Sequence, residues 1–349
     1  MKEITIQEQQ ARLYDYQKGF QAVYLMNAGI DLGLFQAINN LEGGATSIEL
    51  ASQLGLHEPY VRTWCYTAYH LGILDSEEGS RFKLAPHMLT LLTDTQNPFY
   101  FGHWARFMTS YMADALGRLP EYFKSGCRHS YDIFDDVHGQ QFSRDMKALS
   151  NQVVPVVLTY VCIPRIPGLK EKLTSGARVL DVGCGSGLLL IRLAQAFPNS
   201  QFIGVEIDRF AVADAQKDIK GNGVEDRVSV ILANSASIHY ENEFDLVTMG
   251  LVLHEVSPEF RSATIAKCHT ALKDSGSIVI LDFAYPETLE DFRNTRYSLG
   301  IMDQFFETTW GSKHICASAR GELLREHGFK NPATFPIADG SLEVTHARK

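Results

Sequence analysis

The half of the chain after residue 175 limits the possible folds most, because β-like runs and helical stretches alternate there with regular spacing. Runs rich in Val and Ile predict strands at 178–182, 201–206, 228–232, 244–249 and 277–283. The stretches between and after them predict helices at 188–197, 210–220, 258–272 and 317–327, and two more β-like runs follow at 331–337 and 341–346. Such alternation predicts an α/β domain in which helices cover both faces of a parallel, doubly wound sheet.

A glycine-rich turn follows the first predicted strand and opens the first predicted helix of this region. The segment reads Asp-Val-Gly-Cys-Gly-Ser-Gly over residues 181–187. Glycines let a backbone approach a ligand closely, and the free N–H groups at the start of a helix point toward it. A P-loop needs a GxxxxGK pattern, which is absent, and a dinucleotide loop needs Gly where Leu188 stands. The pattern DxGxGxG therefore fits neither of these two nucleotide-binding classes.

This pattern resembles the first motif of the class I methyltransferases that use S-adenosyl-L-methionine (SAM). The matching residues are Asp181, Gly183, Gly185 and Gly187. Glu206, at the end of the second strand, matches the acidic residue that binds the ribose hydroxyls, for which a carboxylate offers two acceptor oxygens. Asn234 and Ser235 stand where that family has Asp and a small residue beside the adenine. The resemblance implies SAM as the cofactor and S-adenosyl-L-homocysteine as its product.

The N-terminal part is helical in pattern, with one helix predicted over 11–40 and then helix, turn, helix and two short β-like runs over 45–84. That order is typical of a winged helix. DNA binding needs several Lys or Arg to neutralise phosphates. Within 45–95, however, three basic residues stand against six acidic ones, and the whole chain carries a formal charge of −9. We therefore expect a packing module here and no nucleic-acid partner.

The whole chain is similar in layout to the plant-type small-molecule O-methyltransferases and their bacterial relatives. At 349 residues it is longer than one hydrophobic core usually supports. The resemblance implies a winged-helix dimerisation domain at 1–98, a helical connector that contributes to the substrate pocket at 99–172, and a Rossmann-like SAM domain at 173–349. It also implies a homodimer that forms through the N-terminal domain.

The remaining composition favours a cytoplasmic protein. The sequence begins without a signal-peptide pattern, and its longest apolar stretch, 153–163, is too short to cross a membrane. The six cysteines form no CxxC pair, which favours free thiols over disulfides or a zinc site. We therefore expect a reducing compartment and no membrane partner.

Three residues are candidates for the chemistry. In the family that the chain resembles, a His after the fourth strand is the general base, and His254 takes that place. A group with a pKa near 6.5 suits removal of a hydroxyl proton as the methyl group moves. Asp282 matches an acidic partner of that His, whereas His314 stands where the family has Glu. This departure leaves a second possibility, in which His254, Glu255 and His314 bind a metal as two histidines and one carboxylate.

The predicted acceptor pocket is apolar and aromatic. A helix over 288–310 is expected to cover it, and the resemblance implies substrate contacts at Gln152, Met302, Phe305, Phe306 and Thr309. Such a lining suits an aromatic or apolar acceptor. Gly250 replaces a Lys that the family places beside the cofactor.

The sequence thus predicts a SAM-dependent methyltransferase that acts on a hydroxyl of a small metabolite. Two alternatives stay open at this point. The acceptor atom could be sulfur, nitrogen or carbon, since such nucleophiles need only positioning. A regulator that responds to SAM through its winged helix is the alternative of another class, and the acidic character of 45–95 disfavours it.

Overall fold

The computed structural model describes residues 4–76, 79–95, 97, 99–126, 136–150 and 154–349. The chain forms two compact units, Met1–Asp114 and Ala115–Lys349. We call them unit 1 and unit 2. The division falls within the stretch expected to be a connector, so the expected three-part organisation stays a prediction.

Unit 1 is mostly helical. Its elements are α1 (Ile6–Asp31), α2 (Leu34–Asn40), α3 (Ser47–Leu54), α4 (Glu58–His70), β1 (Leu74–Asp75), β2 (Lys83–Leu84), α5 (Met88–Thr93), α6 (Gly102–Phe107) and the π-helical η1 (Met108–Met112), with α7 (Ala113–Gly117) at the division. The single helix predicted over 11–40 was wrong, because Gly33 adopts φ 71° and separates α1 from α2. Glycine is the residue that takes this left-handed conformation without steric cost.

Packing in unit 1 explains the apolar face of α4. Val61, Cys65 and Ala68 are buried there. Trp64 meets Phe35 edge to face at 5.2 Å and donates its indole N–H to the Leu25 carbonyl at 3.0 Å. These residues therefore serve the core of unit 1, as the acidic composition of this region suggested.

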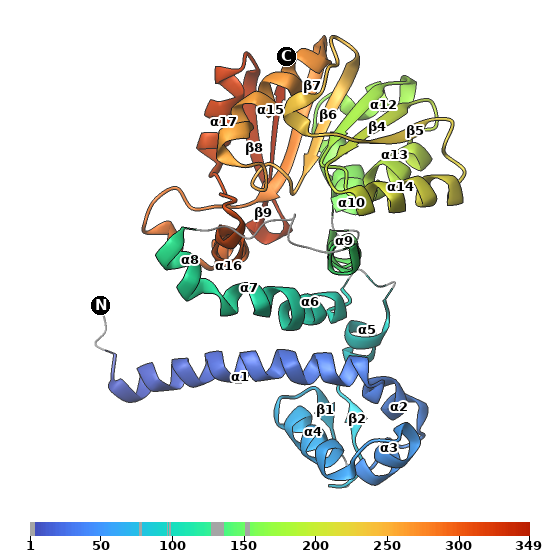
Figure 1. Ribbon diagram of the computed structural model, residues 1–349, viewed down its shortest axis with the longest axis vertical. Coiled ribbons are helices and arrows are strands. Elements are labelled where there is room, and N and C mark those ends of the chain that lie inside the picture. The colour runs from blue at the N-terminus through green and yellow to red at the C-terminus, as the bar shows by residue number, and fades with distance from the viewer. Residues whose placement is uncertain (1–3, 77–78, 96, 98, 127–135, 151–153) are drawn as a thin grey trace. The chain divides into compact units, whose positions relative to one another are not determined.

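Unit 2 is built on one seven-stranded sheet (Figure 1). Its strands lie in the order β5-β4-β3-β6-β7-β9-β8, with β5 to β7 parallel and the last two antiparallel. The strands are β3 (Arg178–Val182), β4 (Gln201–Glu206), β5 (Val228–Leu232), β6 (Phe244–Gly250), β7 (Leu272–Phe283), β8 (Lys330–Ile337) and β9 (Leu342–Arg348). The predicted doubly wound α/β sheet is confirmed. The order reverses between β3 and β6, which is where ligands bind in sheets of this kind.

The other described elements of unit 2 are helical segments. They are α8 (Leu119–Ser125), α9 (Asp136–Ser150), α10 (Val154–Val157), η3 (Leu158–Cys162), α11 (Ile163–Arg165), α12 (Leu169–Ser175), α13 (Leu188–Ala196), α14 (Arg209–Gly221), η4 (Ser235–Ser237), α15 (Pro258–Ala271), η5 (Asp291–Arg293), η6 (Thr295–Tyr297), α16 (Ser298–Glu307), η7 (Thr308–Trp310), α17 (Ala317–Glu326) and η8 (Ala338–Gly340). The uninterrupted helix predicted over 288–310 was wrong. The Asn294 side chain accepts from the Arg296 N–H at 3.0 Å, and this local turn competes with helix.

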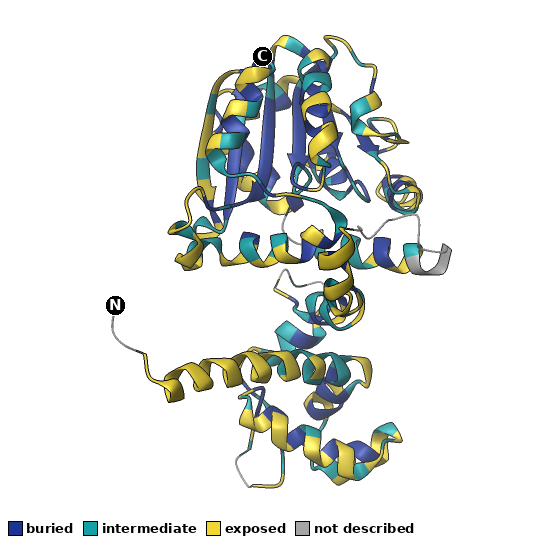
Figure 2. Cartoon of the chain, turned by 60° about the vertical axis from the view of Figure 1, so that its left-hand side comes forward, coloured by how far each residue is buried: buried dark blue, intermediate teal, exposed yellow. Residues whose placement is uncertain are grey.

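The strands are largely buried, as their dark blue colour in Figure 2 shows, and alternate residues belong to two separate cores. Val279 and Leu281 of β7 pack with α12, α13 and α14, whereas Ile278 and Ile280 pack with α15 and α17. A period of two residues is what a sheet covered on both faces requires.

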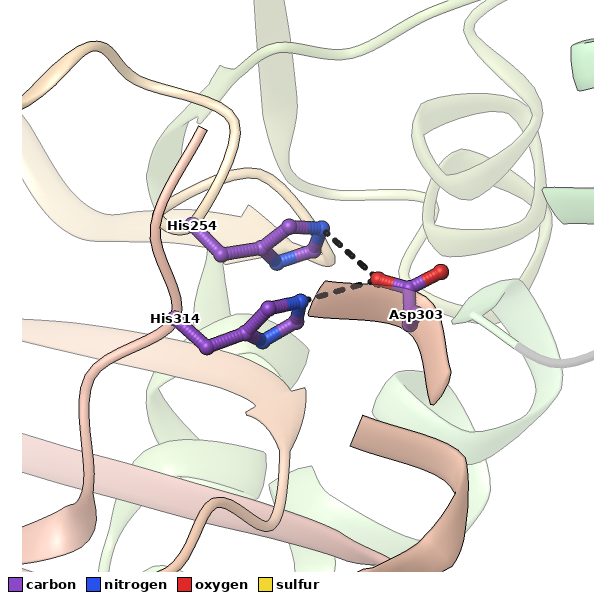
Figure 3. Close-up of side chains that lie close together, drawn as sticks. All are labelled: His254, Asp303 and His314. Carbon is purple, nitrogen blue, oxygen red and sulfur yellow. Dashed lines mark hydrogen bonds and ion pairs between the residues drawn. The ribbon is translucent and has the colours of Figure 1, made fainter. Parts of the chain in front are cut away.

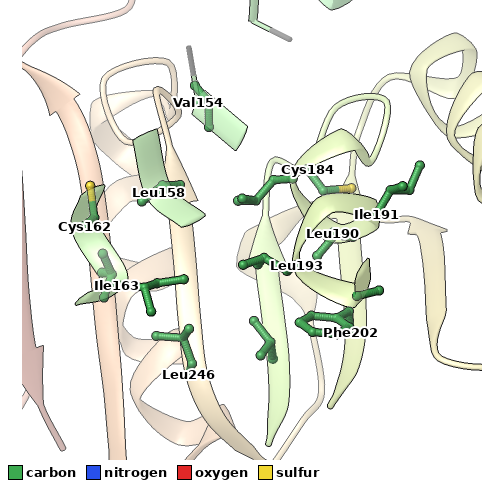
Figure 4. Packing of buried hydrophobic residues seen from close by; sticks show 14 of the residues in the cluster. Val154, Leu158, Cys162, Ile163, Cys184, Leu190, Ile191, Leu193, Phe202 and Leu246 are labelled. Carbon is green, nitrogen blue, oxygen red and sulfur yellow. The ribbon is translucent and has the colours of Figure 1, made fainter. Parts of the chain in front are cut away.

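In the part of the chain that the structure describes, one stretch, Gly139–Arg165, is long and apolar enough to cross a membrane by length and composition alone. Core helices pass the same test, and part of this window is core. Leu158, Cys162 and Ile163 pack against Leu246 of β6 (Figure 4). Burial against the sheet therefore accounts for much of the apolar character of this stretch.

A buried cation joins the last strands to α17. The Arg320 guanidinium is paired with Glu343, and it donates to the carbonyls of Phe283 at 3.2 Å and Ile315 at 2.9 Å. Arg320 and Glu343 are 1% and 4% exposed. Removing one partner of such a pair leaves an uncompensated charge in the interior.

We predict that Glu343→Leu destabilises the protein by about 3–5 kcal/mol, because Arg320 then stays buried without its carboxylate. Urea unfolding measures the change. The control is Glu243→Leu, which removes the partly exposed pair that Glu243 makes with Arg178 and should cost at most about 1 kcal/mol. Equal losses in the two variants would contradict this account.

Candidate active site

The glycine loop, residues 183–187, connects β3 to α13 at the carboxyl edge, the edge of the sheet where β3 to β7 end. Gly183, Gly185 and Gly187 all have positive φ, at 68°, 51° and 73°. A Cβ on Gly183 would lie 2.5 Å from a Val252 methyl, so no larger residue fits there. A Cβ on Gly185 would meet no atom within 4 Å, so it would project into open space. The loop therefore presents bare backbone to a cleft that Asp181, Ser186 and Gly250 also line.

Glu206 lies at the end of β4 and faces this loop. One carboxylate oxygen accepts from the Gly185 N–H at 2.7 Å, and the other accepts from Ile207 and Asp208 at 2.7 and 2.9 Å. Partial burial raises the pKa of Glu206, and the three N–H groups oppose that rise. These donors hold the carboxylate in place beside the loop.

Asp181 is buried beneath the loop. It pairs in register with Thr248 on β6, whose hydroxyl donates to the Asp181 carboxylate at 2.7 Å. Burial raises the pKa of Asp181 to about 7, although the Thr248 hydrogen bond works in the opposite direction. A buried carboxyl that keeps its proton toward neutral pH makes folding sensitive to pH.

Asn234 and Ser235 follow β5 at the same edge. The Asn234 side chain accepts from the Ala236 N–H at 2.9 Å and thereby caps η4, and the Ser235 hydroxyl lies 3.1 Å from that of Thr264. Both residues thus shape the turn that ends β5. Their predicted contacts with adenine stay a prediction.

Gly250, at the end of β6, has a packing reason to be Gly. A Cβ there would lie 2.5 Å from a Val154 methyl of α10. The Val154 side chain therefore occupies space that a Lys at position 250 would need.

His254 and Asp282 form a buried pair at the ends of β6 and β7. The His254 Nδ1 lies 2.6 Å from the Asp282 carboxylate, which also accepts from the Phe283 N–H at 2.8 Å. Both side chains are at most 3% exposed. The carboxylate favours a proton on Nδ1, so the Nε2 of His254 faces away from Asp282 and toward α16.

The charges of this pair support each other. Burial alone would lower the pKa of His254, but the Asp282 carboxylate and further acidic groups outweigh burial and raise it to about 10. Burial would raise the pKa of Asp282, but His254 and Arg320 lower it to about 2. At neutral pH the pair is therefore an imidazolium beside a carboxylate in the protein alone.

His314 lies directly on His254. The two rings stack at 4.2 Å with an angle of 10°, and Tyr285 stacks on the other side of His314 at 5.4 Å. Asp303 of α16 accepts from the His314 Nε2 at 2.9 Å and lies 3.9 Å from the His254 Nε2. Burial lowers the pKa of His314, and the hydrogen bond with Asp303 opposes that change. Both predicted histidines therefore meet in the site.

Two side chains hold the loops that carry these histidines. Arg261 donates to the carbonyls of His254 at 3.3 Å and Lys313 at 2.7 Å. Gln304 accepts from the His314 N–H at 2.6 Å and donates to the Ser312 carbonyl at 3.1 Å. The segment around His314 is thereby anchored both to α15 and to α16.

Known proteins resemble this chain in sequence and in fold. Residues 173–323 match a family model described as Methyltransferase domain. The 3-hydroxy-5-methyl-1-naphthoate 3-O-methyltransferase of Streptomyces sahachiroi is 22% identical over 330 residues, which is 93% of this chain and 91% of that protein.

Two solved structures share the fold over nearly the whole chain. Human N-acetylserotonin methyltransferase, solved with SAM, has a TM-score of 0.77 at 15% identity and covers 100% of this chain and 99% of its own. An O-methyltransferase from neocarzinostatin biosynthesis, solved with SAM and 2-hydroxy-5-methyl naphthoic acid, has a TM-score of 0.71 at 17% identity and covers 94% and 95%.

Residues 173–323 therefore correspond to a methyltransferase domain. The cofactor expected from the sequence is SAM, and the groups at the carboxyl edge fit it. Gly185 opens the loop toward the cleft, and Glu206 presents the carboxylate that a ribose diol requires.

The predicted acceptor contacts of this methyltransferase lie in different surroundings. Met302 and Phe305 are 66% and 47% exposed, so within this chain neither is buried beside His254. Phe306 and Thr309 are buried, and Phe306 packs on Trp310 at 5.4 Å. Gln152 lies outside the described residues. The acceptor-binding roles of these five residues stay predictions.

The carboxylate beside the histidines was missed from the sequence. Asp303 takes the place expected for Glu255, which is exposed and does not join the two imidazoles. Asp303 and Glu307 are separated by four residues on α16, so they share a helix face. Two acids on one face of the segment 299–307, whose other residues apart from Gln304 are apolar or Gly, were the available signal.

We predict that the raised pKa of Asp181 makes folding of this methyltransferase weaken as pH rises. The unfolded chain loses this proton near 3.8 and the native protein near 7, so unfolding releases a proton between those values. Wild type should lose up to about 1.4 kcal/mol of stability per pH unit in this window relative to Asp181→Asn. Chemical unfolding from pH 4 to 8 measures the difference. Parallel pH curves for the two proteins would contradict it, and the exposed Asp274→Asn serves as control.

Proposed function

We propose that the protein transfers the methyl group of SAM to a hydroxyl oxygen of a small aromatic or apolar metabolite. The observation that carries the proposal is the buried His254–Asp282 pair, which lies at the same edge of the sheet as the glycine loop. The relatives support the acceptor class, since one is a naphthoate 3-O-methyltransferase and another was solved with a hydroxylated naphthoic acid.

Bound SAM supplies an electrophilic methyl group on a positively charged sulfur. The chain has to bind that cofactor, align the acceptor and take up its proton. The glycine loop and Glu206 are proposed to hold the cofactor, and Asn234 and Ser235 to flank its adenine.

His254 is proposed to take the proton of the acceptor hydroxyl at Nε2. Its Nδ1 is committed to Asp282, which holds the ring in one orientation and stabilises its charged form. The ring must be neutral before it can accept a proton. The pKa of His254 is expected to fall when a positive charge stands nearby, because a cation disfavours a second one.

His314 is proposed to keep the His254 ring in place and to contact the acceptor. The evidence is the ring stack at 4.2 Å and the Asp303 carboxylate that lies beside both Nε2 atoms. The stack leaves the edges of the rings, and not their faces, available to an acceptor.

We further propose that the protein is a cytoplasmic homodimer that assembles through unit 1 and binds no nucleic acid or membrane. On α1 several large apolar side chains are exposed, among them Leu13 at 65%, Tyr16 at 72% and Phe20 at 64%. An exposed apolar row of this length marks an interaction surface. Five free cysteines among the described residues support a reducing compartment.

We predict that Glu206→Gln weakens SAM binding by roughly 10- to 100-fold, because a hydrogen bond to a charged group contributes about 1.5–3 kcal/mol. Isothermal titration with SAM measures the affinity. The exposed Glu241→Gln should bind as wild type does. Equal affinities in the two variants would remove Glu206 from the cofactor site.

We predict that His254→Ala lowers turnover by about 100- to 10,000-fold, the range that proton transfer contributes, while SAM affinity stays near that of wild type. Transfer of labelled methyl from SAM into a panel of hydroxylated naphthoates and related phenols measures turnover. The exposed His239→Ala is the matched control. Retained turnover in His254→Ala would remove the proposed base, and loss of SAM binding would point to a structural defect.

A further inference from the structure

Two imidazole rings and one carboxylate converge in unit 2 (Figure 3). They are His254 after β6, His314 in the segment after η7, and Asp303 of α16. One nitrogen of each ring and one carboxylate oxygen all lie within 4.8 Å of one another. Both rings point the Nε2 edge toward Asp303. Three elements thus bring three potential metal ligands to one point.

Asp303 makes a hydrogen bond with one of the two rings and comes near the other without bonding to it. Asp303 lies 2.9 Å from the His314 Nε2 but 3.9 Å from the His254 Nε2, which is too far for a hydrogen bond. Metal–nitrogen bonds of about 2.0–2.1 Å place the ligand atoms of one ion roughly 3–3.5 Å apart. The three atoms lie within 4.8 Å, and the two rings, which are stacked at an angle of 10°, would have to tilt so that both Nε2 lone pairs meet at one ion.

The surroundings orient the rings as metal-bound imidazoles are oriented. His254 holds Asp282 at 2.6 Å through Nδ1, and this leaves Nε2 free to act as a ligand. The backbone N–H of His314 is held by Gln304, the neighbour of Asp303 on α16. Asp282 thus holds the ring of His254, and Gln304 holds the backbone of His314, before any ion binds.

The local charges also favour a cation. Asp282, Asp303 and Glu307 bring three carboxylates to the two imidazoles. Glu307 is 5% exposed, lies one helical turn after Asp303, and its Oε2 has no hydrogen-bond partner among the described residues. Burial raises the pKa of Glu307 to about 7, so either a proton or a bound cation can compensate this carboxyl group.

We propose that His254, Asp303 and His314 bind one divalent first-row transition-metal ion. Two imidazoles and one carboxylate are the donors that Zn²⁺ and Fe²⁺ accept in sites with open coordination positions. Asp303 is the anionic ligand, and Glu307 is placed to compensate charge.

This inference rests on the proposed function for the identity of the methyl donor and the acceptor. It differs in the group that activates the acceptor hydroxyl, which is a metal ion and not His254. A divalent ion lowers the pKa of a hydroxyl that binds to it. The His254 Nε2 lone pair cannot hold a metal and accept a proton at once. In the metal-free protein the hydroxyl proton would pass to the His254 Nε2, whereas in the metal-loaded protein it would pass to solvent water, because Nε2 then holds the ion.

The test measures metal binding directly and needs no acceptor. Full-length protein without an affinity tag is stripped with a chelator and titrated with Zn²⁺ against a chromophoric competitor, and Co²⁺ absorption reports the coordination. Wild type should bind about one ion per chain. Asp303→Asn and His314→Ala should each lose about 100-fold or more in affinity, and Asp282→Asn less, since loss of an outer partner costs roughly 10- to 100-fold.

Matched controls are Asp274→Asn and His239→Ala, which remove an exposed carboxylate and an exposed imidazole. They should bind Zn²⁺ as wild type does. Stoichiometry well below one ion in wild type, or equal affinity in Asp303→Asn and the controls, would overturn the metal site. Circular dichroism of each variant separates this result from misfolding.

Methyl transfer by the stripped protein then tests the proposed function on its own. Turnover without metal, together with failure to bind Zn²⁺, would overturn the metal site and leave methyl transfer intact. Metal binding without turnover on any acceptor tested would count against the proposed function and leave the metal site intact.

Discussion

The carboxyl edge of one parallel sheet is the constraint on which the site depends. Strands β3 to β7 run in the same direction, so the residues that follow each of them gather at one edge. The glycine loop, Glu206, His254 and Asp282 come from four different strands and meet for this reason alone. The two cores, one on each face of the sheet, hold these strand ends in place. The site residues that follow the strands are therefore held in place as well.

The second half of the site lies outside the sheet, and buried arginines attach it. Arg261 donates hydrogen bonds to the carbonyl of His254 in one loop and to the carbonyl of Lys313 in another. Arg320 does the same between the end of β7 and the segment that carries His314. Each guanidinium has several donors in a fixed plane, so one side chain can fasten two loops. Positions far from the chemistry thus decide how closely the two histidines approach.

This difference between sheet and loops also explains what could be predicted from the sequence. The first three strands of the sheet were predicted at their observed bounds, because Val- and Ile-rich runs between helices have few alternative structures. The glycine loop was recognised from its spacing after a strand, and Glu206 from the resemblance to class I methyltransferases. His254 and Asp282 were expected from the resemblance.

Asp303 was not expected, because its contact with His314 depends on how α16 folds back across the sheet edge. The helix predicted over 288–310 did not show that geometry, since Asn294 caps the short η6 and α16 begins only at Ser298. Gly33 shows the same limit in unit 1. A single left-handed residue ended a helix whose periodicity continued on both sides. Short-range turns of this kind are decided by one hydrogen bond or one φ angle, which the hydrophobic pattern does not contain.

The role of His254 finally depends on which positive charge balances the acidic groups around it. In the protein alone a proton does so, and the pKa of His254 rises to about 10 because Asp282 and its acidic neighbours favour the charged ring. A base has to lose that proton, and a metal ligand has to lose it as well. Both chemistries therefore require another cation in the site, either the sulfonium of SAM or a metal ion held by the two imidazoles and Asp303. Both the base and the metal-ligand roles depend on the excess of carboxylates around His254, which favours a positive charge in this pocket.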